Sequence, residues 1–277
     1  MTVGELFNRI RSELESGGIE DHRFEAEQLL LAAGIDRLTL VTDPQREISG
    51  DISAEISGKT ARRIAGEPLQ YILGEWEFYG LPFRVGEGVL IPRQDTETIV
   101  EIARRFLEAR AADSRRTLDL CAGSGCIGIT LAKLAKADVI CVEKSSLAFR
   151  YLKENIALNG VSIMAILGDA LDERKAPGEY DLIVSNPPYL TAEDMGALQR
   201  EVRFEPQAAL FGGEDGLEFY RALIPMYAKM LASGGMLAVE IGMGQENAVC
   251  EMFRDNGLTP QCERDLSGII RVAYSIK

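Results

Sequence analysis

From Thr117 onward, short apolar runs alternate with helical stretches, and this alternation limits the folds open to the chain more than any other feature. The expected strands are residues 117–120, 139–142, 163–167, 182–185 and 236–241, followed by 259–264 and 269–275. Strands that alternate with helices build a mostly parallel sheet that is covered on both faces. Only a short turn at Ser267-Gly268 separates the last two strands, so they should form an antiparallel hairpin. The sequence thus predicts an α/β fold with a seven-stranded, mostly parallel sheet.

The first 70 residues predict a small helical domain. Thr2 and Glu5 have the spacing of a capping box, and apolar residues follow at helical intervals as far as Leu14. A second helix that ends at Gly34 is expected, with an apolar face of Phe24, Ala26, Leu29, Leu30 and Ala33. Further helix is expected around Ile48, Ile52, Ile56 and Ile64. Because this part carries no catalytic constellation, we predict that residues 1–70 dock a substrate.

Two further segments complete the predicted organisation of the chain. Residues 71–93 are rich in aromatic and β-branched residues with Gly and Pro between them, which predicts a β-hairpin linker. Asp95 and Thr96 are then expected to cap a helix whose apolar face begins at Ile99. This helix and the alternating strands form the remaining predicted domain, residues 94–277.

Composition excludes several classes of protein. The only histidine is His22, expected on a helix surface, which excludes Ser-His-Asp and Cys-His triads and histidine-based metal clusters, and no metal is expected. The five cysteines form no C-x-x-C pair, which favours a reduced protein of the cytoplasm. No apolar run approaches the roughly 18 residues of a membrane span. The N-terminus has no apolar region typical of a secretory signal, so no membrane association is expected.

A glycine-rich loop follows the first strand of the alternating part. Residues 119–128 are DLCAGSGCIG, with Gly123, Gly125 and Gly128 at the spacing of a dinucleotide fingerprint, and Glu143 ends the next strand. Such glycines allow close backbone approach, and an acid at this distance accepts hydrogen bonds from ribose hydroxyls. The loop predicts a nucleoside-containing cofactor. By itself it fits a nicotinamide dinucleotide and S-adenosylmethionine equally.

Three neighbouring features favour S-adenosylmethionine. Asp119, just before the loop, suits the cationic amino-acid end of that cofactor and would repel a pyrophosphate, although it could instead cap local backbone. Asp169, beside Ala170 after the third strand, is expected to accept from the adenine amine, or else to be a solvated turn residue. The closing antiparallel hairpin suits a methyltransferase better than a dehydrogenase. Cys121 and Cys126 beside the loop are expected to be packing residues.

The fourth strand ends in VSNPPYL, residues 184–190. Pro187 and Pro188 lack an N–H and force the residues before them out of the helical region, so the corner offers carbonyl acceptors without competing donors. Asn186 adds a side-chain carbonyl and Tyr189 a flat ring. Such a corner is suited to hold a planar NH2 group while an amide or aromatic amine is methylated. The alternative is a rigid turn with Tyr189 in the core.

Taken together, these features resemble the HemK/PrmC family. The matching segments are Tyr71-x-x-Gly74, Phe78-x-Gly80, LIPRQDTE at 90–97, DLCAGSG at 119–125, VSNPPY at 184–189, EVRFEPQAAL at 201–210 with GGEDGL following, and DLSGIIRV at 265–272. The resemblance implies a Rossmann-like S-adenosylmethionine methyltransferase domain preceded by a small N-terminal helical domain. It also implies methylation of the glutamine in the Gly-Gly-Gln loop of class-1 peptide chain release factors.

The resemblance further implies which residues form the site. The cofactor contacts expected from it, together with those expected above, are Asp119, Cys121, Ala122, Gly123, Ser124, Gly125, Glu143, Asp169, Ala170 and Asn186. Asn186 and Pro187 are implied to accept from the glutamine amide, with Pro188 and Tyr189 beside it; the catalytic residues are Asn186, Pro187 and Tyr189. The chain departs from the family at Glu143, where Asp is usual, and at Cys121-Ala122, where Gly or Thr is more common.

The net charge of −13 bears on the partner. A protein that grips nucleic acid usually shows a basic stripe, so no stable nucleic-acid binding is expected, and an acidic field favours the basic tip of a release factor. One alternative is an adenine amino-methyltransferase acting on DNA or RNA, because the N-P-P-Y motif is shared with such enzymes. The others are a nonenzymatic cofactor-binding adaptor, disfavoured by the intact Asp119, Glu143 and Asn186, and a nicotinamide dehydrogenase, for which no proton-transfer residue is evident.

Overall fold

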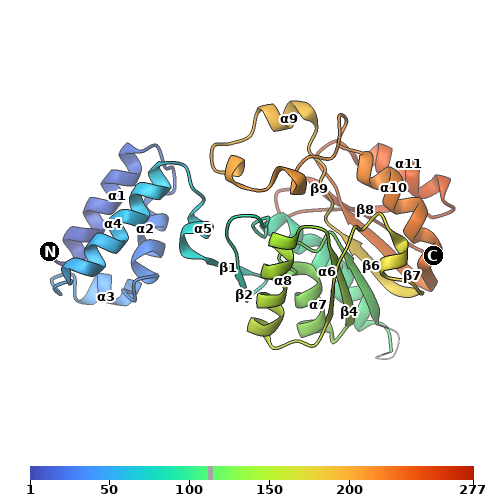
Figure 1. Cartoon of the computed structure of the whole chain (residues 1–277), viewed down its shortest axis with the longest axis horizontal. Coiled ribbons are helices and arrows are strands. Elements are labelled where there is room, and N and C mark those ends of the chain that lie inside the picture. Colours follow the sequence, from blue (N-terminus) through green and yellow to red (C-terminus); the bar gives the residue numbers. More distant parts are fainter. Residues whose placement is uncertain (112–114) are drawn as a thin grey trace. The chain divides into compact units, whose positions relative to one another are not determined.

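The structure is a computed structural model that describes residues 1–111 and 115–277 (Figure 1). Its Cα positions divide into two compact units. One consists of Met1–Gly74 with Gln199–Phe204, and the other of Glu75–Leu198 with Glu205–Lys277. A short segment from the second half of the sequence is therefore part of the N-terminal unit. The functional division into docking domain, linker and catalytic domain stays a prediction.

The N-terminal unit is helical. Its helices are α1 (Val3–Ser16), α2 (His22–Leu31), α3 (Arg37–Thr42), α4 (Gly50–Ile64) and α5 (Leu69–Leu73), with the 3-10 turn η3 (Val202–Phe204). The predicted capping box is confirmed: the Thr2 hydroxyl accepts from the backbone N–H of Glu5 at 3.2 Å, and the Glu5 carboxylate accepts from the Thr2 N–H at 2.9 Å. The apolar face of α1 is buried as predicted, at Val3, Leu6, Phe7, Ile10 and Leu14.

The predicted apolar face of the second helix needs correction. Ala26, Leu29 and Leu30 are buried, but Phe24 is 48% exposed because it lies on the opposite side of α2. Among the isoleucines expected to mark a later helix, Ile56 is fully buried in α4. Ile48, Ile52 and Ile64 are only half-buried, and Ile48 precedes the helix.

A buried charge cluster holds the short segment from the second half of the chain to the N-terminal helices. Arg63 of α4 is 6% exposed and donates to the Glu25 carboxylate of α2, Nε to Oε2, at 2.7 Å. Its Nη2 also pairs with the Glu201 carboxylate at 2.6 Å. A buried arginine needs such partners, since an unpaired buried charge costs several kcal/mol. Arg63 therefore ties residues 199–204 to their unit.

The larger unit is built on a seven-stranded sheet, which confirms the predicted fold class. The strands are β3 (Arg116–Leu120), β4 (Asp138–Glu143), β5 (Met164–Leu167), β6 (Tyr180–Ser185), β7 (Leu231–Glu240), β8 (Gln261–Arg264) and β9 (Ile270–Ile276). The order is β5-β4-β3-β6-β7-β9-β8, and the pairs from β5 to β7 are parallel. The predicted antiparallel hairpin of β8 and β9 is confirmed, and β9 also runs antiparallel to β7. The chain thus places its last strand inside the sheet and leaves β8 at the edge.

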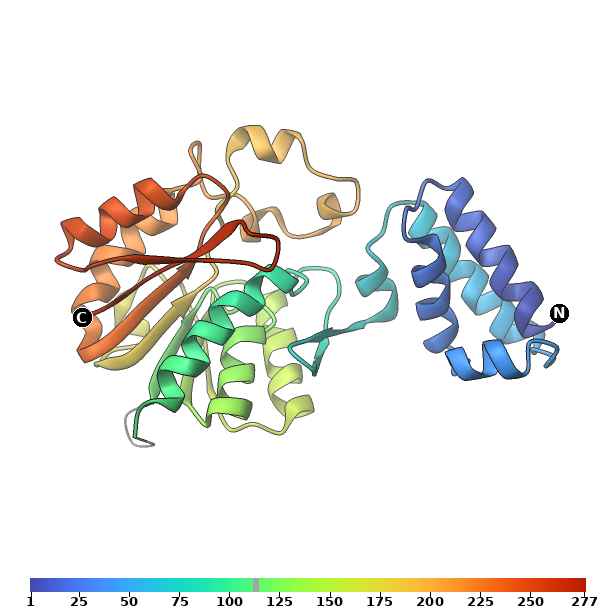
Figure 2. The ribbon, with the colours of Figure 1, turned by 180° about the vertical axis from the view of Figure 1, so that it is seen from behind.

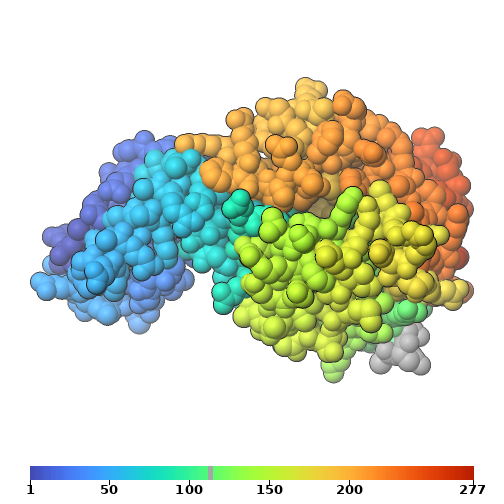
Figure 3. Space-filling model, in the orientation of Figure 1, coloured from blue at the N-terminus to red at the C-terminus, as the bar shows by residue number. Residues whose placement is uncertain are grey.

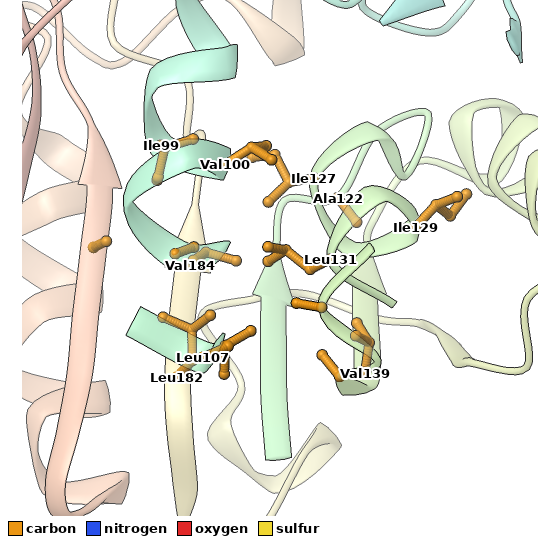
Figure 4. Packing of buried hydrophobic residues seen from close by; sticks show 14 of the residues in the cluster. Ile99, Val100, Leu107, Ala122, Ile127, Ile129, Leu131, Val139, Leu182 and Val184 are labelled. Atoms are coloured by element: carbon orange, nitrogen blue, oxygen red, sulfur yellow. The ribbon is translucent and has the colours of Figure 1, made fainter. Parts of the chain in front are cut away.

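Helices cover both faces of this sheet (Figures 1 and 2). On one face lie α6 (Glu97–Glu108), α7 (Cys126–Ala135) and α8 (Ser146–Asn159), and on the other lie α10 (Glu218–Tyr227) and α11 (Glu246–Asp255). Figure 4 shows the first of these layers, where Ile99 and Leu107 of α6 pack beside Leu182 and Val184 of β6. The central strands β3 and β6 are buried along most of their length, as a sheet covered on both faces requires.

A two-stranded hairpin, β1 (Glu75–Phe78) with β2 (Leu81–Arg84), precedes the sheet and belongs to the larger unit. The buried Asn155 of α8 fixes it: Oδ1 accepts from the Arg84 N–H at 2.6 Å, and Nδ2 donates to the Arg84 carbonyl at 3.1 Å. The same Nδ2 donates to the Ser124 carbonyl at 2.9 Å. One amide thus joins the hairpin, α8 and the glycine loop.

The predicted cap of α6 is wrong in detail. Residues Gln94–Thr96 form a 3-10 turn, η1, and Thr96 occupies the N-cap position of α6, but no side chain caps the helix. The Thr96 hydroxyl is used elsewhere, as described below. Other short elements of this unit are η2 (Glu173–Lys175), α9 (Ala192–Gly196), η4 (Gln207–Ala209) and η5 (Ala228–Met230). No described helix is both long enough and apolar enough to cross a membrane.

Candidate functional site

A cavity of about 270 Å³ lies at the carboxyl edge of the parallel strands in the larger unit. This edge is where open α/β sheets bind ligands. The predicted site residues that line it are Cys121, Ala122, Gly123, Ser124, Glu143, Asp169, Ala170, Asn186 and Pro188. The predicted residues that do not line it are Asp119, Gly125, Pro187 and Tyr189. Residues from four strand ends, far apart in the sequence, are therefore brought together around one space.

The glycine loop turns sharply between β3 and α7. Gly123 and Gly125 have φ of +56° and +82°, in the left-handed region that glycine adopts without strain. A Cβ on Gly128 would lie 2.7 Å from the Cys141 sulfur and 2.8 Å from the Asp119 carboxylate, so only glycine lets α7 pack this closely on the strands. The loop has the conformation that brings backbone N–H groups close to a cofactor.

Asp119 lies beneath this loop and not on the cavity surface. It is fully buried, and its Oδ2 accepts from the Gly128 N–H at 2.9 Å. Its Oδ1 has no hydrogen-bond partner among the described residues. Burial raises the pKa of Asp119 to about 7, and the bond from Gly128 opposes that rise. The structure thus favours the backbone-holding alternative for Asp119 over direct contact with a cofactor.

Glu143 faces the cavity from the end of β4. Its Oε2 accepts from the Gly123 N–H at 2.7 Å, and its Oε1 accepts from the Ser145 N–H at 2.6 Å. Burial raises its pKa, and these backbone donors lower it. Each carboxylate oxygen accepts more than one hydrogen bond, so the group can also bind a pair of hydroxyls. The carboxylate that replaces the usual Asp therefore joins the glycine loop to the start of α8.

Asp169 stands at the rim of the cavity in an ion pair that the sequence did not predict. Its Oδ2 lies 2.8 Å from Nζ of Lys144, and its Oδ1 accepts from the Leu171 N–H at 3.0 Å. The Lys144 ammonium lowers the pKa of Asp169. Lys144 also lines the cavity. In the sequence, only the position of Lys144 directly after Glu143 could have indicated that it belongs to the site.

The cysteines beside the loop are packing residues, as expected. Burial raises the pKa of Cys121 and of Cys126 to about 12, so neither is a thiolate nucleophile at neutral pH. Cys121 has a φ of +57°, in the left-handed region that glycine adopts more readily than other residues. Elsewhere, Cys250 and Cys262 have their sulfurs 3.3 Å apart as free thiols, and neither lines the cavity.

The Asn-Pro-Pro-Tyr corner follows β6, which is the neighbour of β3 in the sheet, so the corner lies at the same edge as the glycine loop. Asn186 donates from Nδ2 to the Thr96 hydroxyl at 3.2 Å, which leaves its Oδ1 as an acceptor. The corner itself is held in place by its backbone: the Tyr189 N–H donates to the Leu210 carbonyl at 3.1 Å, and the Tyr189 carbonyl accepts from Gln245 at 2.9 Å. The sequence did not predict Thr96 or Gln245 as parts of this site.

Tyr189 is placed differently from the prediction. Its ring is half-buried against the hydrophobic cluster that includes Tyr220 and Leu223 of α10. Its hydroxyl donates to Oε1 of Glu240 at 3.4 Å. The space around it requires glycine: a Cβ on Gly216 would lie 2.3 Å from the Tyr189 carbonyl oxygen, and one on Gly212 would lie 2.7 Å from its Cα. These glycines belong to the GGEDGL segment, whose role the sequence alone did not show.

The segment after the corner supplies another wall. Glu205 is 3% exposed and accepts from the Ile91 N–H at 2.9 Å while it pairs with Arg93. Pro206, Ala208 and Ala209 follow it and line the cavity. In Figure 3 this orange part of the chain borders the green and yellow-green part that contributes the loop and α8. Glu205 thus joins the LIPR and EPQAAL segments, which match the family most narrowly.

Within residues 1–111 and 115–277, no group of three or more His, Cys, Asp or Glu residues is arranged to hold a metal ion. His22, at the start of α2, is half-buried and its Nδ1 lies 3.2 Å from the Ile19 carbonyl oxygen. It belongs to the N-terminal unit.

Comparisons with known proteins match both parts of the chain. A family model described as the PrmC N-terminal domain matches residues 5–74, and one described as the methyltransferase small domain matches residues 97–208. A release factor glutamine methyltransferase of Geobacter sulfurreducens is 44% identical, over 98% of this chain and 95% of its own. One of Caulobacter vibrioides is 37% identical, over 100% of this chain and 97% of its own. A solved methyltransferase of Pyrococcus furiosus shares the fold, with a TM-score of 0.55 at 17% identity over 83% of this chain and 99% of that one.

Proposed function

This chain belongs to the release factor glutamine methyltransferase family, and we propose that its cavity performs that family's reaction through the Asn-Pro-Pro-Tyr corner. The enzyme transfers a methyl group from S-adenosylmethionine to the side-chain amide nitrogen of the glutamine in the Gly-Gly-Gln motif of class-1 peptide chain release factors. The observation that carries the proposal is the orientation of Asn186, whose NH2 is occupied by Thr96 and whose carbonyl oxygen remains an acceptor.

The cavity fits S-adenosylmethionine. The open space at Gly123, where a Cβ would meet no atom within 4 Å, gives a cradle for close backbone contact, and the buried Glu143 carboxylate faces that cradle. We assign contacts with the cofactor to Cys121, Ala122, Gly123 and Ser124, to Glu143 at the ribose, and to Asp169 and Ala170 at the adenine. Asp119 and Gly125 support the loop from behind. When bound, the cofactor supplies an electrophilic methyl group on a sulfonium.

The corner deals with the poor nucleophilicity of an amide. The nitrogen lone pair of the glutamine amide is delocalised, so the protein has to orient it and stabilise the positive charge that develops as it attacks. Oδ1 of Asn186 accepts a hydrogen bond from one N–H of the substrate amide. We assign the other N–H to the carbonyl of Pro187, which does not line the cavity but lies between the lining residues Asn186 and Pro188. The attached proton becomes acidic after methyl transfer and leaves without a strong base. Pro188 lines the wall, and Tyr189 holds the corner by its hydroxyl and carbonyl bonds.

Charge supports a protein substrate over nucleic acid. With a net charge of −13, the protein attracts a basic partner surface. The tip of a release factor, which probes ribosomal RNA, is expected to be such a surface. The same charge opposes stable binding to DNA or RNA phosphates. The N-terminal helical unit, whose predicted range is residues 1–70, docks the release factor, and the reaction takes place in the cytoplasm.

One set of incubations tests this function. Purified enzyme and methyl-labelled S-adenosylmethionine are offered a class-1 release factor, the same factor with its Gly-Gly-Gln glutamine changed to alanine, and DNA or RNA. We expect label on the unmodified factor alone. Label on nucleic acid, or equal label on the alanine variant, would contradict the proposal and favour an adenine amino-methyltransferase or another protein target.

A further inference from the structure

The Thr96 hydroxyl lies between two side chains that come from different strands. On one side it accepts from Nδ2 of Asn186, which follows β6, at 3.2 Å. On the other side it interacts with the carboxyl of Glu240, the last residue of β7. Thr96 is 2% exposed, so water does not compete freely for these contacts. The three side chains form a chain of polar groups that begins at the cavity wall, which Asn186 and Thr96 line, and ends at the buried Glu240.

A hydroxyl has one proton, and this fixes the direction of the chain. An ionised carboxylate only accepts hydrogen bonds, and the Thr96 hydroxyl favours the ionised form of Glu240, so the Thr96 proton is directed toward that carboxylate. The oxygen of Thr96 is then left to accept, and the group that donates to it is the NH2 of Asn186. With its NH2 engaged, the Asn186 amide cannot turn over without losing a bond. Its carbonyl oxygen then remains available to accept from a methyl acceptor bound in the cavity, which Asn186 lines.

Glu240 lies in the core, where burying a carboxyl group is energetically costly. It is 1% exposed; its Oε1 takes a long bond of 3.4 Å from the Tyr189 hydroxyl, and its Oε2 has no partner among the described residues. A buried carboxyl with so few partners lowers stability. The Thr96 hydroxyl, which holds Asn186, favours the charged form of Glu240, and the tyrosine of the same corner donates to it.

The charged and titratable groups around Glu240 come from several elements. Arg271 of β9 and the Tyr189 hydroxyl favour its ionised form, whereas Asp95 of η1 disfavours it. Arg271 is itself shared with Asp95 at 3.0 Å and with Asp265 at 3.2 Å. Tyr220 of α10 and Cys126 of α7 also feel the Glu240 charge. Some neighbours of Glu240 therefore favour its ionised form, which only accepts hydrogen bonds, and others favour its protonated form, which can also donate.

We propose that Thr96 and Glu240 are positioning residues that set the direction of the Asn186 amide, so that its oxygen and not its nitrogen faces the methyl acceptor. This inference rests on the proposed function for its catalytic consequence, but the hydrogen-bond direction is a property of the free enzyme. Neither residue is required to touch the reacting atoms. Their effect reaches the reaction through Asn186.

A pair of matched substitutions tests the role of Thr96. Thr96→Val keeps the branched shape and removes the hydroxyl, whereas Thr96→Ser keeps the hydroxyl and removes a methyl group. We expect Thr96→Val to lower kcat about tenfold or more, because the lost bond involves a charged partner, and Thr96→Ser to stay within about threefold of wild type. The Kd for S-adenosylmethionine should change less than about twofold in both, which shows that the cavity is intact.

Glu240→Gln tests the other end of the chain. Glutamine has nearly the same shape but can donate its NH2 to Thr96, which frees the Thr96 proton to turn toward Asn186 and lets the Asn186 amide adopt either direction. Its kcat should fall with unchanged cofactor affinity. Wild-type turnover in Glu240→Gln or Thr96→Val, or an equal loss in Thr96→Val and Thr96→Ser, would overturn the proposal.

A readout without turnover separates this inference from the proposed function. In ¹⁵N-labelled enzyme, the side-chain NH2 signals of Asn186 are identified by their absence in Asn186→Ala. Thr96→Val should shift these signals and speed their exchange with water, and Thr96→Ser should leave them near wild type. Unchanged signals in Thr96→Val would overturn the inference even for an active enzyme. Shifted signals in an enzyme that methylates no release factor would uphold the hydrogen-bond direction and refute the function.

Discussion

Asn186 donates a hydrogen bond from Nδ2 to the Thr96 hydroxyl at 3.2 Å, across 90 positions of the sequence. This bond joins the end of β6 to the start of α6 at the carboxyl edge of the sheet. It gives the amide of the Asn-Pro-Pro-Tyr corner a defined direction before any substrate arrives. Preorganised acceptors of this kind stabilise developing charge without reorganising during the reaction.

The close packing of Gly216 against Tyr189 predicts the effect of an alanine substitution, and Gly244 offers a matched control. Gly216 and Gly244 have similar φ, +71° and +83°, so alanine costs similar backbone strain at both. A Cβ on Gly216 would also lie 2.3 Å from the Tyr189 carbonyl oxygen, whereas one on Gly244 meets no atom within 4 Å. Gly216→Ala should therefore lower kcat and cost about 1–3 kcal/mol more unfolding free energy than Gly244→Ala. Equal effects, measured by denaturant unfolding and methyl transfer, would show that the corner tolerates displacement.

Glu205 anchors the EPQAAL segment through its ion pair with Arg93, and this pair should contribute more to stability than an exposed ion pair does. Glu205 is buried and holds both Ile91 and Arg93, so Glu205→Gln should cost about 1–3 kcal/mol of unfolding free energy and raise the KM for cofactor. Asp215 pairs with Arg221 on the surface, where both side chains are 52% exposed. Asp215→Asn should leave stability and KM unchanged, because solvent screens such pairs. Urea unfolding of both variants distinguishes them, and a Glu205→Gln variant as stable as Asp215→Asn contradicts the anchor.

Buried carboxyls predict how stability depends on pH. Burial raises the folded-state pKa of Asp119 from 3.8 to about 7, so the folded protein holds this proton more tightly than the unfolded chain does. The stability contributed by the protonated carboxyl is fully present below 3.8 and is lost as pH rises toward about 7. Unfolding free energies measured across this range should fall with pH, and less steeply in Asp119→Asn. An identical slope in the variant would show that Asp119 ionises normally.

The second such carboxyl predicts a pH dependence of turnover. Burial raises the pKa of Glu240 to about 7, and only its ionised form obliges Thr96 to donate and Asn186 to present its oxygen. The kcat for methyl transfer should therefore rise as pH increases through about 7. Glu240→Gln should lack this rise, and Asp119→Asn should keep it, since Asp119 does not line the cavity. A pH profile of Glu240→Gln that matches wild type would assign the rise to another group.

The sequence predicted those features that depend on local pattern. Alternating apolar runs located the strands, because a strand covered on both faces has to be apolar throughout. The glycine spacing located the loop, since only glycine permits the φ of Gly123 and the approach of α7 at Gly128. The prolines located the corner, because they remove N–H donors wherever they stand.

Features decided by tertiary contacts were missed or misplaced. Asp119 precedes the loop as an acid near a cofactor would, but β3 turns its carboxyl toward α7, where Gly128 binds it. Thr96 has the sequence of a helix cap, yet its hydroxyl is taken by Asn186, 90 positions away. Glu240 and Gln245 reach Tyr189 only because β7 lies beside β6 in the sheet. No local pattern specifies which strands become neighbours.

In the proposed reaction, the Asn186 carbonyl holds the amide to be methylated and does not serve merely to shape the cofactor cavity. The most direct measurement is the single-turnover rate of methyl transfer to a release factor by Asn186→Ala, made together with its Kd for S-adenosylmethionine. We predict a rate lower by about 100-fold or more, as for loss of one preorganised polar group, with a Kd within about threefold of wild type. A rate near that of wild type, or a loss of rate explained entirely by weaker cofactor binding, would contradict the claim.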